Sequence, residues 1–306
     1  MNKKPIFSII IPTYNRPEQL ATCLEALTRL DYPRDCFEVI IVDDGSPMCL
    51  DSVLSPFKEQ LTAELIRQDN AGPAAARNTG SIHAKGQFLA FTDDDCLPAP
   101  NWLQALGQGF TTFPNAVLGG YTLNKLSDNI YSETSQLLLA YIYAYYNSEL
   151  DQAHFFASNN LALAANHFHS LGGFDTTFPL AAAEDREFCD RCLKKRYRLV
   201  YLSAAQVDHA HHLNLGSFWR QHFNYGRGAF HFHHIRSQRG SKKIQVEPLS
   251  FYLKLLIYPL RHRSVVVGLI LSSLFFVSQV ANVAGFFWEL ERQNKFMSRR
   301  FCQRDL

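Results

Sequence analysis

Residues 7–11 read Phe7-Ser8-Ile9-Ile10-Ile11. This stretch is short, uncharged and rich in β-branched residues, which is typical of a strand buried on both faces of a sheet. Similar runs occur at residues 37–42 and 88–91, and a weaker one at residues 64–66. Helical patterns fill the intervals, beginning with leucines at helical spacing after Pro17. Strands that alternate with helices predict an α/β fold with a mostly parallel central sheet, flanking helices and right-handed crossovers.

Composition excludes several classes of protein. The chain has 306 residues, of which 47% are hydrophobic and 19% are charged. It is therefore not a disordered chain, a collagen-like chain or a disulfide miniprotein. Lys and Arg (30) nearly balance Asp and Glu (28), so no basic field predicts a nucleic-acid partner. Seven cysteines, an odd number, indicate free thiols in a reducing compartment.

The C-terminal region is the most hydrophobic part of the chain. Residues 264–288 hold no charged residue between Arg263 and Glu289, and this length predicts a transmembrane helix. The alternative is a buried core helix of a soluble protein. Residues 249–260 are apolar except for Lys254, so they either lie in the membrane interface or pair with the span. Basic residues on both flanks leave the orientation open.

Acidic residues follow two of the predicted strands. Asp93, Asp94 and Asp95 come after the run at residues 88–91, and adjacent carboxylates at a strand end repel one another unless a cation compensates them. Oxygen ligands of this kind suit Mg²⁺ or Mn²⁺, with substrate phosphates completing the shell. A solvated turn with a helix cap is the alternative. Since ligands bind at the carboxyl ends of parallel strands, the position favours a metal site.

Two further motifs surround the same predicted edge. Asp43 and Asp44 follow the second strand and suit a nucleobase or ribose, or simply form a tight turn with the following glycine. Gly72 begins a helix of small residues whose N-terminus suits an anion. Arg77 lies one turn into this helix. The alternative is close helix–sheet packing, with Arg77 pairing an aspartate such as Asp44.

Glu184 and Asp185 begin a predicted helix that ends near Arg196. Acidic residues in a first turn complement the helix dipole, which is the simple explanation of their position. The functional explanation makes one carboxylate a general base that reaches a hydroxyl group of the substrate.

Histidines and cysteines form three further clusters. The first cluster, His209, His211 and His212, offers a single histidine to the carboxylate metal site. The second, at residues 231–234, is expected in an interfacial region near the membrane. Cys189 and Cys192 form a lone Cys-x-x-Cys inside the predicted helix, which does not favour a zinc or redox site.

Taken together, these motifs resemble family-2 glycosyltransferases of the GT-A fold. The resemblance covers about residues 5–230, and the motifs occur in the order seen in that family. They are Ser8–Arg16 (SIIIPTYNR), Val42–Ser46 (VDDGS), Gly72–Gly80 (GPAAARNTG), Asp93–Asp95, Gly172–Asp175 (GGFD) and Glu184–Asp185.

The resemblance implies an inverting, metal-dependent transfer of a sugar from a nucleoside-diphosphate donor. Asp185 matches the catalytic base, and Glu184 is its neighbour. The metal, Mg²⁺ or Mn²⁺, is expected at Asp95, with Asp93 and His209, although His211 is a further candidate. Asn160 and Gly173 fall on the acceptor side. The residues expected along the nucleotide sugar are Pro12, Thr13, Tyr14, Asp43, Asp44, Arg77, Asp93 and Asp94.

The resemblance also sets the expected domain organisation. Residues 1–245 form the catalytic domain, with a nucleotide-binding half at 1–125 and an acceptor-binding half at 126–245, and residues 246–306 form the membrane-associated region. Processive members carry Gln-x-x-Arg-Trp, whereas here Gln221 is followed by His222-Phe223-Asn224-Tyr225, so single additions are expected.

The expected partners are a nucleoside-diphosphate sugar, with UDP-sugars favoured, and a glycan or lipid-linked acceptor, in polysaccharide or glycolipid synthesis. The chain is expected to be anchored in the inner or plasma membrane with its catalytic domain in the cytoplasm, where nucleotide sugars occur. Two alternatives remain. One is a non-catalytic nucleotide-sugar-binding or assembly protein on the same fold. The other is a nucleotidyltransferase, although the chain lacks a glycine-rich loop with a lysine after the first strand.

Overall fold

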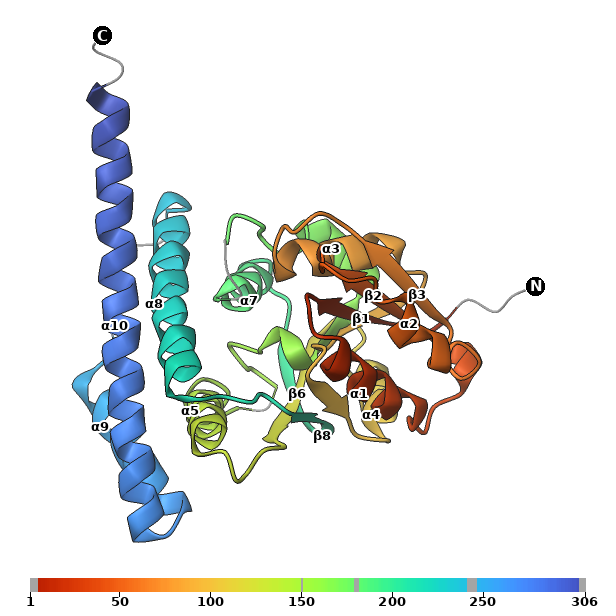
Figure 1. Cartoon of the computed structure of the whole chain (residues 1–306), viewed down its shortest axis with the longest axis horizontal. Helices are drawn as coiled ribbons and strands as arrows, with labels where there is room; N and C mark the ends of the chain where they lie inside the picture. Colours follow the sequence, from red (N-terminus) through yellow and green to blue (C-terminus); the bar gives the residue numbers. More distant parts are fainter. Residues whose placement is uncertain (1–4, 150, 179–181, 241–246, 303–306) are drawn as a thin grey trace. The chain divides into compact units, whose positions relative to one another are not determined.

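One mixed β-sheet organises the part of the chain that the computed structural model describes, which is residues 5–149, 151–178, 182–240 and 247–302. Among these residues the sheet has eight strands in the order β3-β2-β1-β4-β7-β6-β8-β5 (Figure 1). The strands are β1 (Phe7–Thr13), β2 (Phe37–Asp43), β3 (Ala63–Arg67), β4 (Phe88–Phe91), β5 (Cys96–Pro98), β6 (Val117–Asn124), β7 (Leu161–Ala164) and β8 (Leu199–His209).

The four strands predicted from the sequence form the parallel half of this sheet. β1 pairs in parallel with β2 and β4, and β2 pairs in parallel with β3. Every residue of β1 and β2 is buried, as expected for strands covered on both faces. The register places Thr13 opposite Asp43, and Asp43 opposite Arg67, so the polar residues that follow these strands share one edge.

Helices and short turns connect these strands. In the first half of the chain the helices are α1 (Pro17–Thr28), α2 (Asp51–Leu54), α3 (Pro73–His83) and α4 (Trp102–Thr112). Later in the chain come α5 (Ile130–Tyr146), α6 (Ala165–Leu171) and α7 (Glu184–Lys194), and the 3-10 turns are η1 (Arg34–Cys36), η2 (Ser55–Phe57) and η3 (Ser158–Asn160). Proline begins α1 and α3, as predicted at Pro17.

The other half of the sheet was not predicted from the sequence. β7 runs antiparallel to both β4 and β6, and β5 runs antiparallel to β8. β8 pairs in parallel with β6, with a register shift between Gly120 and Tyr121, and it alternates exposed and buried residues only over residues 204–207. A short antiparallel strand such as β7 carries no helix-length spacing that would mark it in the sequence.

The described residues divide into two compact units. The first consists of Met1–Leu126, Ile142–Pro179 and Glu184–His211, and it holds the sheet. The second consists of Ser127–Tyr141, Leu180–Ala183 and His212–Leu306. Its helices are the first part of α5 with α8 (Leu215–Gln238), α9 (Leu249–His262) and α10 (Val265–Cys302). The predicted domain boundary at residues 245 and 246 stays a prediction.

The predicted apolar segment 264–288 lies in α10. Within this helix Val265–Lys295 is long enough to cross a membrane. Its most apolar 18-residue window has a mean hydropathy of 1.9, and 28% of that window is buried. The segment before it forms the helix α9, as expected if this segment pairs with the span. Length and composition alone are weak evidence for a membrane span, because core helices of soluble proteins also have them.

Candidate active site

The aspartates that follow β4 lie at the carboxyl edge of the parallel strands. The carboxylate of Asp94 is buried and accepts hydrogen bonds from Thr13 Oγ1 at 2.8 Å and Arg16 Nη1 at 3.1 Å. Thr13 ends β1, so the bond ties together two neighbouring strand ends. Burial raises the pKa of Asp94 to about 6, although Arg16 opposes this. Thr13 and Asp94, both expected along the nucleotide sugar, are therefore in contact in the structure.

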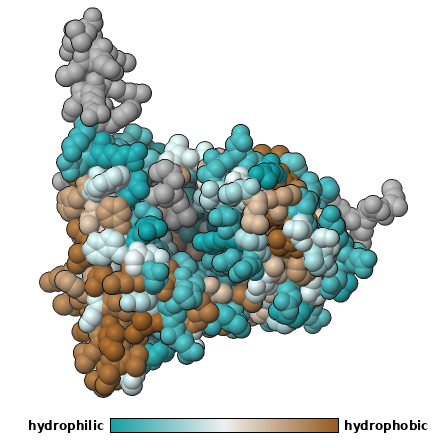
Figure 2. All heavy atoms as spheres, in the orientation of Figure 1, coloured by the Kyte–Doolittle hydropathy of each residue, from teal (hydrophilic) through white to brown (hydrophobic). Residues whose placement is uncertain are grey.

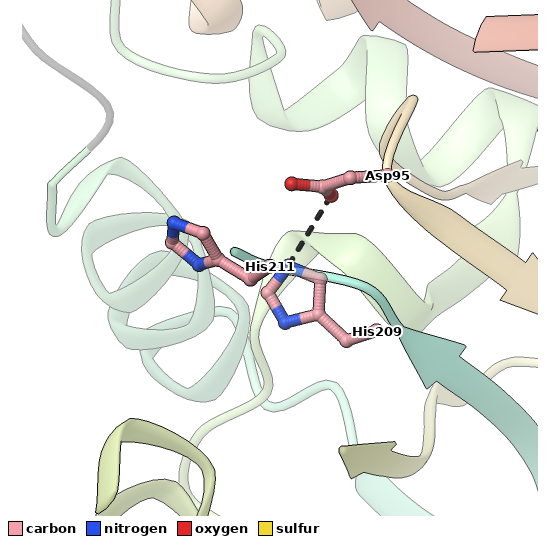
Figure 3. A group of neighbouring side chains, drawn as sticks. All are labelled: Asp95, His209 and His211. Atoms are coloured by element: carbon pink, nitrogen blue, oxygen red, sulfur yellow. Dashed lines mark ion pairs between the residues drawn. The ribbon is translucent and has the colours of Figure 1, made fainter. Parts of the chain in front are cut away.

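Asp95 belongs to a group of three potential metal ligands with His209 and His211. Their ligand atoms all lie within 4.8 Å of one another, and His209 Nε2 is 3.2 Å from Asp95 Oδ1. Figure 3 shows the two rings at the end of β8 beside the Asp95 carboxylate. β5 and β8 bring them together, because Cys96 lies opposite His209 in the antiparallel register. The sequence analysis favoured His209 as a metal ligand, and the structure places His211 in the same group.

The protonation of this group reflects burial and mutual charge. Burial would raise the pKa of Asp95, but His209 and Arg16 outweigh it and hold the pKa below its usual range. Burial would lower the pKa of His209, but the Asp95 carboxylate raises it. Burial and the neighbouring His209 lower the pKa of His211 to about 4. A carboxylate and a neutral imidazole are thus ready to act as metal ligands, which must be deprotonated to bind.

These donors fit a divalent transition metal. A carboxylate oxygen suits Mg²⁺ and Mn²⁺ alike, whereas imidazole nitrogens suit transition metals and are poor ligands for Mg²⁺. The set of one carboxylate and two imidazoles therefore fits Mn²⁺ better than Mg²⁺. Asp93, which the sequence also assigned to the metal, is not a member of this group.

Asp93 instead pairs with Arg77, and this arginine connects two motifs that are distant in the sequence. Arg77 is buried in α3 and donates from Nη2 to Asp93 Oδ1 at 2.6 Å and from Nη1 to Glu184 Oε1 at 3.2 Å. The sequence suggested an aspartate partner such as Asp44, and the partner is Asp93. One guanidinium group thus joins the acidic end of β4 to the first turn of α7.

Glu184 and Asp185 differ in their surroundings. Glu184 is buried and bound to Arg77, whereas Asp185 is partly exposed and accepts the backbone N–H of Arg186 at 2.7 Å. Burial raises the pKa of both carboxyls, and the charge of Asp185 helps to bring that of Glu184 to about 7. Of the two, Asp185 is the more exposed, and a general base must be accessible to the substrate.

Asp43 and Asp44 organise the loops at the ends of β2 and β3. Asp43 accepts the backbone N–H of Ser46 at 2.9 Å. Asp44 accepts from Gln68 Nε2 at 2.7 Å and from the backbone N–H groups of Ala71 and Gly72 at 2.9 and 2.8 Å. Gly72 has a positive φ of 89° and precedes α3, so Asp44 shapes the entry to that helix. Their contact with a nucleobase stays a prediction.

The remaining residues predicted along the nucleotide belong to one short segment. Pro12 is buried within β1 opposite Val42, whereas Tyr14 follows the strand with 49% of its surface exposed. Tyr14 is thus accessible to solvent at the same edge of the sheet. The contact of Pro12 and Tyr14 with a nucleotide stays a prediction.

The two residues predicted on the acceptor side have structural contacts of their own. Asn160 is buried; its amide accepts from Trp102 Nε1 at 2.9 Å and donates to the carbonyl of Ala205 at 2.9 Å. Gly173 has a φ of 71°, and a Cβ atom there would lie 2.5 Å from Asn78 Oδ1. Both residues therefore support the local fold, and their contact with an acceptor stays a prediction.

Arg16 is the residue of this site to which the sequence gave no role. Its side chain is 47% exposed, and Nη1 lies 3.1 Å from Asp94 Oδ1 and 3.2 Å from Asp95 Oδ2. Arg16 thus places a positive charge directly beside the carboxylates of Asp94 and Asp95. The sequence offered one clue to this role, because Arg16 belongs to the first motif and follows the strand that ends at Thr13.

The clusters that the sequence set aside are separate from this group. Cys189 and Cys192 are buried free thiols in α7, and burial raises the pKa of each above its ordinary value. A buried, protonated thiol is a poor metal ligand. Residues 231–234 lie in α8, which belongs to the second unit.

The fold is similar to that of two solved glycosyltransferases. The mannosyltransferase PcManGT from Pyrobaculum calidifontis, solved with GDP-Man and Mn²⁺, has a TM-score of 0.62 at 20% identity, over 91% of this chain and 76% of that one. Residues 1–349 of Staphylococcus aureus TarS, solved with UDP-GlcNAc, have a TM-score of 0.51 at 17% identity, over 94% and 91% of the two chains. This likeness confirms the predicted GT-A fold.

Curated relatives match only part of the chain. Glycosyltransferase AglE of Haloferax volcanii is 39% identical over 102 residues, which are 33% of this chain and 34% of AglE. Chondroitin synthase of Escherichia coli is 36% identical over 115 residues, 37% of this chain and 17% of that one. The chain thus spans about a third or less of these relatives.

Family models cover more of the chain than these relatives do. The model "Glycosyl transferase family group 2" matches residues 90–288. The model "Glycosyl transferase family 2" matches residues 8–170, more than half of the 306-residue chain. This chain therefore belongs to glycosyl transferase family 2.

Proposed function

We propose that this chain is an inverting glycosyltransferase that moves a sugar from a nucleoside-diphosphate sugar to an acceptor hydroxyl. The observation that carries the proposal is the pair of ion pairs made by Arg77. They link Asp93, the neighbour of Asp94 and Asp95, to Glu184, the neighbour of the candidate base Asp185. A donor site and a proton acceptor in one unit are what such a transfer needs.

In the proposed reaction Asp185 takes the proton of the acceptor hydroxyl. The acceptor oxygen then attacks the anomeric carbon from the face opposite the diphosphate, and the nucleoside diphosphate leaves with the bonding electrons. Asp95, His209 and His211 would hold the metal, Mn²⁺ in preference to Mg²⁺. When bound, the metal neutralises the negative charge that develops on the leaving diphosphate.

The donor is proposed to be a UDP-sugar, with Thr13, Tyr14, Asp43, Asp44 and Arg77 on the nucleotide side. The acceptor is a glycan or a lipid-linked sugar, extended by single additions, because the residues after Gln221 depart from the processive pattern. We further propose that residues 1–245 form the catalytic domain in the cytoplasm and that residues 246–306 attach it to the inner or plasma membrane.

Donor binding tests this proposal directly. Since a ligand that binds the folded state raises its apparent stability, thermal unfolding is measured with UDP-, GDP- and dTDP-sugars in the presence of Mn²⁺. One donor class should raise the unfolding temperature, and that donor should then be consumed when acceptors are added. A chain that no nucleotide sugar stabilises would contradict the proposal.

The pH dependence of transfer should report the coupled carboxyl pair. The base works only when it is deprotonated, so kcat/KM should rise with pH as the pair loses its proton. Because burial raises both pKa values, and that of Glu184 to about 7, the acidic limb should lie well above the ordinary carboxyl range. Rates are measured at saturating Mn²⁺.

The substitution Glu184→Gln distinguishes the titrations of the two carboxyls. It removes the neighbouring negative charge while Arg77 remains, so the pKa of Asp185 should fall and the acidic limb should move to lower pH. A limb that stays in place in Glu184→Gln would assign the titration to another group.

A further inference from the structure

An apolar surface runs along α9 and α10 in the second unit. On α10 the exposed side chains recur at three- and four-residue steps, which places them on one face of the helix. Figure 2 shows hydrophobic side chains gathered over this part of the molecule. The exposed residues are Leu249, Leu253 and Ile257 on α9 and Val266, Leu269, Ile270, Phe276, Val280, Val283 and Phe287 on α10.

The opposite face of α10 packs closely against α8. A Cβ atom at Gly226 of α8 would lie 1.8 Å from the carbonyl oxygen of Asn282, and one at Gly285 of α10 would lie 1.9 Å from that of Phe223. Only glycine allows two helix backbones to approach this closely. α8 is therefore fixed beside the middle of the apolar segment Val265–Lys295.

α8 is too polar to enter the hydrocarbon core of a membrane. At its contact with α10, Arg227 Nε lies 2.8 Å from Glu289 Oε2, and the Arg227 guanidinium lies 4.5 Å from the centre of the Trp288 ring. Arg220, earlier in α8, is exposed. If α10 crossed a bilayer over residues 264–288, the Arg227–Glu289 pair would lie at the end of the span. Arg220, one helical turn before the contact of Phe223 with Gly285, would be carried into the lipid, where charged side chains are strongly disfavoured.

We propose that α9 and α10 lie along the surface of an anionic lipid bilayer and do not cross it. The apolar face enters the boundary between headgroups and acyl chains, while α8 covers the other face of α10 on the aqueous side. Exposed cations accompany the apolar face, namely Lys254 and Arg261 on α9. These cations match anionic headgroups, and the partly exposed Trp288 suits the interface. The inference does not depend on the sugar-transfer reaction.

Vesicle binding tests the apolar face. The full chain is mixed with phosphatidylcholine vesicles, with or without the anionic lipid phosphatidylglycerol, and the bound fraction is measured by flotation. The double variant Val266→Glu/Ile270→Glu should bind the anionic vesicles at least about tenfold more weakly. The matched control is Ile82→Glu on α3, because Ile82 is 74% exposed and Val266 is 70% exposed. The control should bind like the parent chain, and thermal unfolding confirms that each variant is folded.

Two results of this assay would overturn the inference. Equal binding by the double variant and the parent would remove the apolar face from membrane contact, and equal binding to both lipid mixtures would remove the headgroup contribution. A parent chain that ignores vesicles and instead forms a dimer, broken by the double variant in analytical ultracentrifugation, would assign the face to a second copy.

Cysteine labelling distinguishes a helix that lies on the membrane from one that crosses it. In a background with Cys49→Ser and Cys302→Ser, Ser264→Cys and Asn294→Cys each place a thiol near one end of the apolar segment Val265–Lys295. The chain is bound to sealed vesicles and treated with a membrane-impermeant maleimide. Both thiols should react equally before detergent is added. If one of them reacts only after detergent, α10 crosses the membrane and the inference is wrong. Both measurements work without donor or acceptor, so an inactive chain would not affect them.

Discussion

Asp185→Asn should lower kcat by about 10²- to 10⁴-fold, the contribution typical of a positioned general base. Asparagine keeps the size of the side chain and can still accept the N–H of Arg186, but it cannot take a proton from the acceptor hydroxyl. Donor binding should persist, because Asp185 is not expected to hold the nucleotide. Initial rates of transfer, together with thermal shifts by the donor, measure the two effects separately.

The matched control is Asp190→Asn, which makes the same change on the same helix. Asp190 pairs with Lys194 at 2.9 Å, so this variant tests for a general effect of losing a carboxylate from α7. Its activity should stay within about twofold of the parent, because the Asp190 carboxylate pairs with the partly exposed Lys194, and such pairs are usually weak. Retention of full activity by Asp185→Asn, with donor binding intact, would favour the non-catalytic nucleotide-sugar-binding alternative.

Asp95→Asn should weaken Mn²⁺ binding by more than about 100-fold, because changes even to residues that only orient metal ligands cost 10- to 100-fold. The substitution removes the single carboxylate of the group with His209 and His211. Transfer should fall by about 10²- to 10³-fold as well, which corresponds to the several kcal/mol that a metal contributes to such a reaction. Electron paramagnetic resonance of free Mn²⁺ gives the affinity without any need for activity.

Asp208→Asn is the control for this experiment. Asp208 precedes His209 in β8, but its carboxylate lies 3.0 Å from Lys125 Nζ rather than in the metal group. Its Mn²⁺ affinity should equal that of the parent chain. If Asp95→Asn binds Mn²⁺ as tightly as the parent while remaining folded, the three residues are not the metal site.

Local patterns predicted the half of the fold whose signals are local. The runs that became β1, β2 and β4 are apolar without interruption because both faces of these strands are buried, and such runs are visible without an alignment. The antiparallel strand β7 was not predicted, because a four-residue strand has no period that separates it from its surroundings. Its place between β4 and β6 depends on contacts distant in sequence.

The candidate site shows the same division. The sequence alone determined which side chains follow the parallel strands, because strand direction carries Thr13, Asp43 and Asp93 to one edge. Only the tertiary structure decided their partners. Arg77 meets Asp93 and Glu184, and His211 joins Asp95, through loops whose paths are set by packing across the sheet. The physical reason is that strand ends follow from local hydrophobicity, whereas a buried charge takes whichever countercharge the folded chain places within reach.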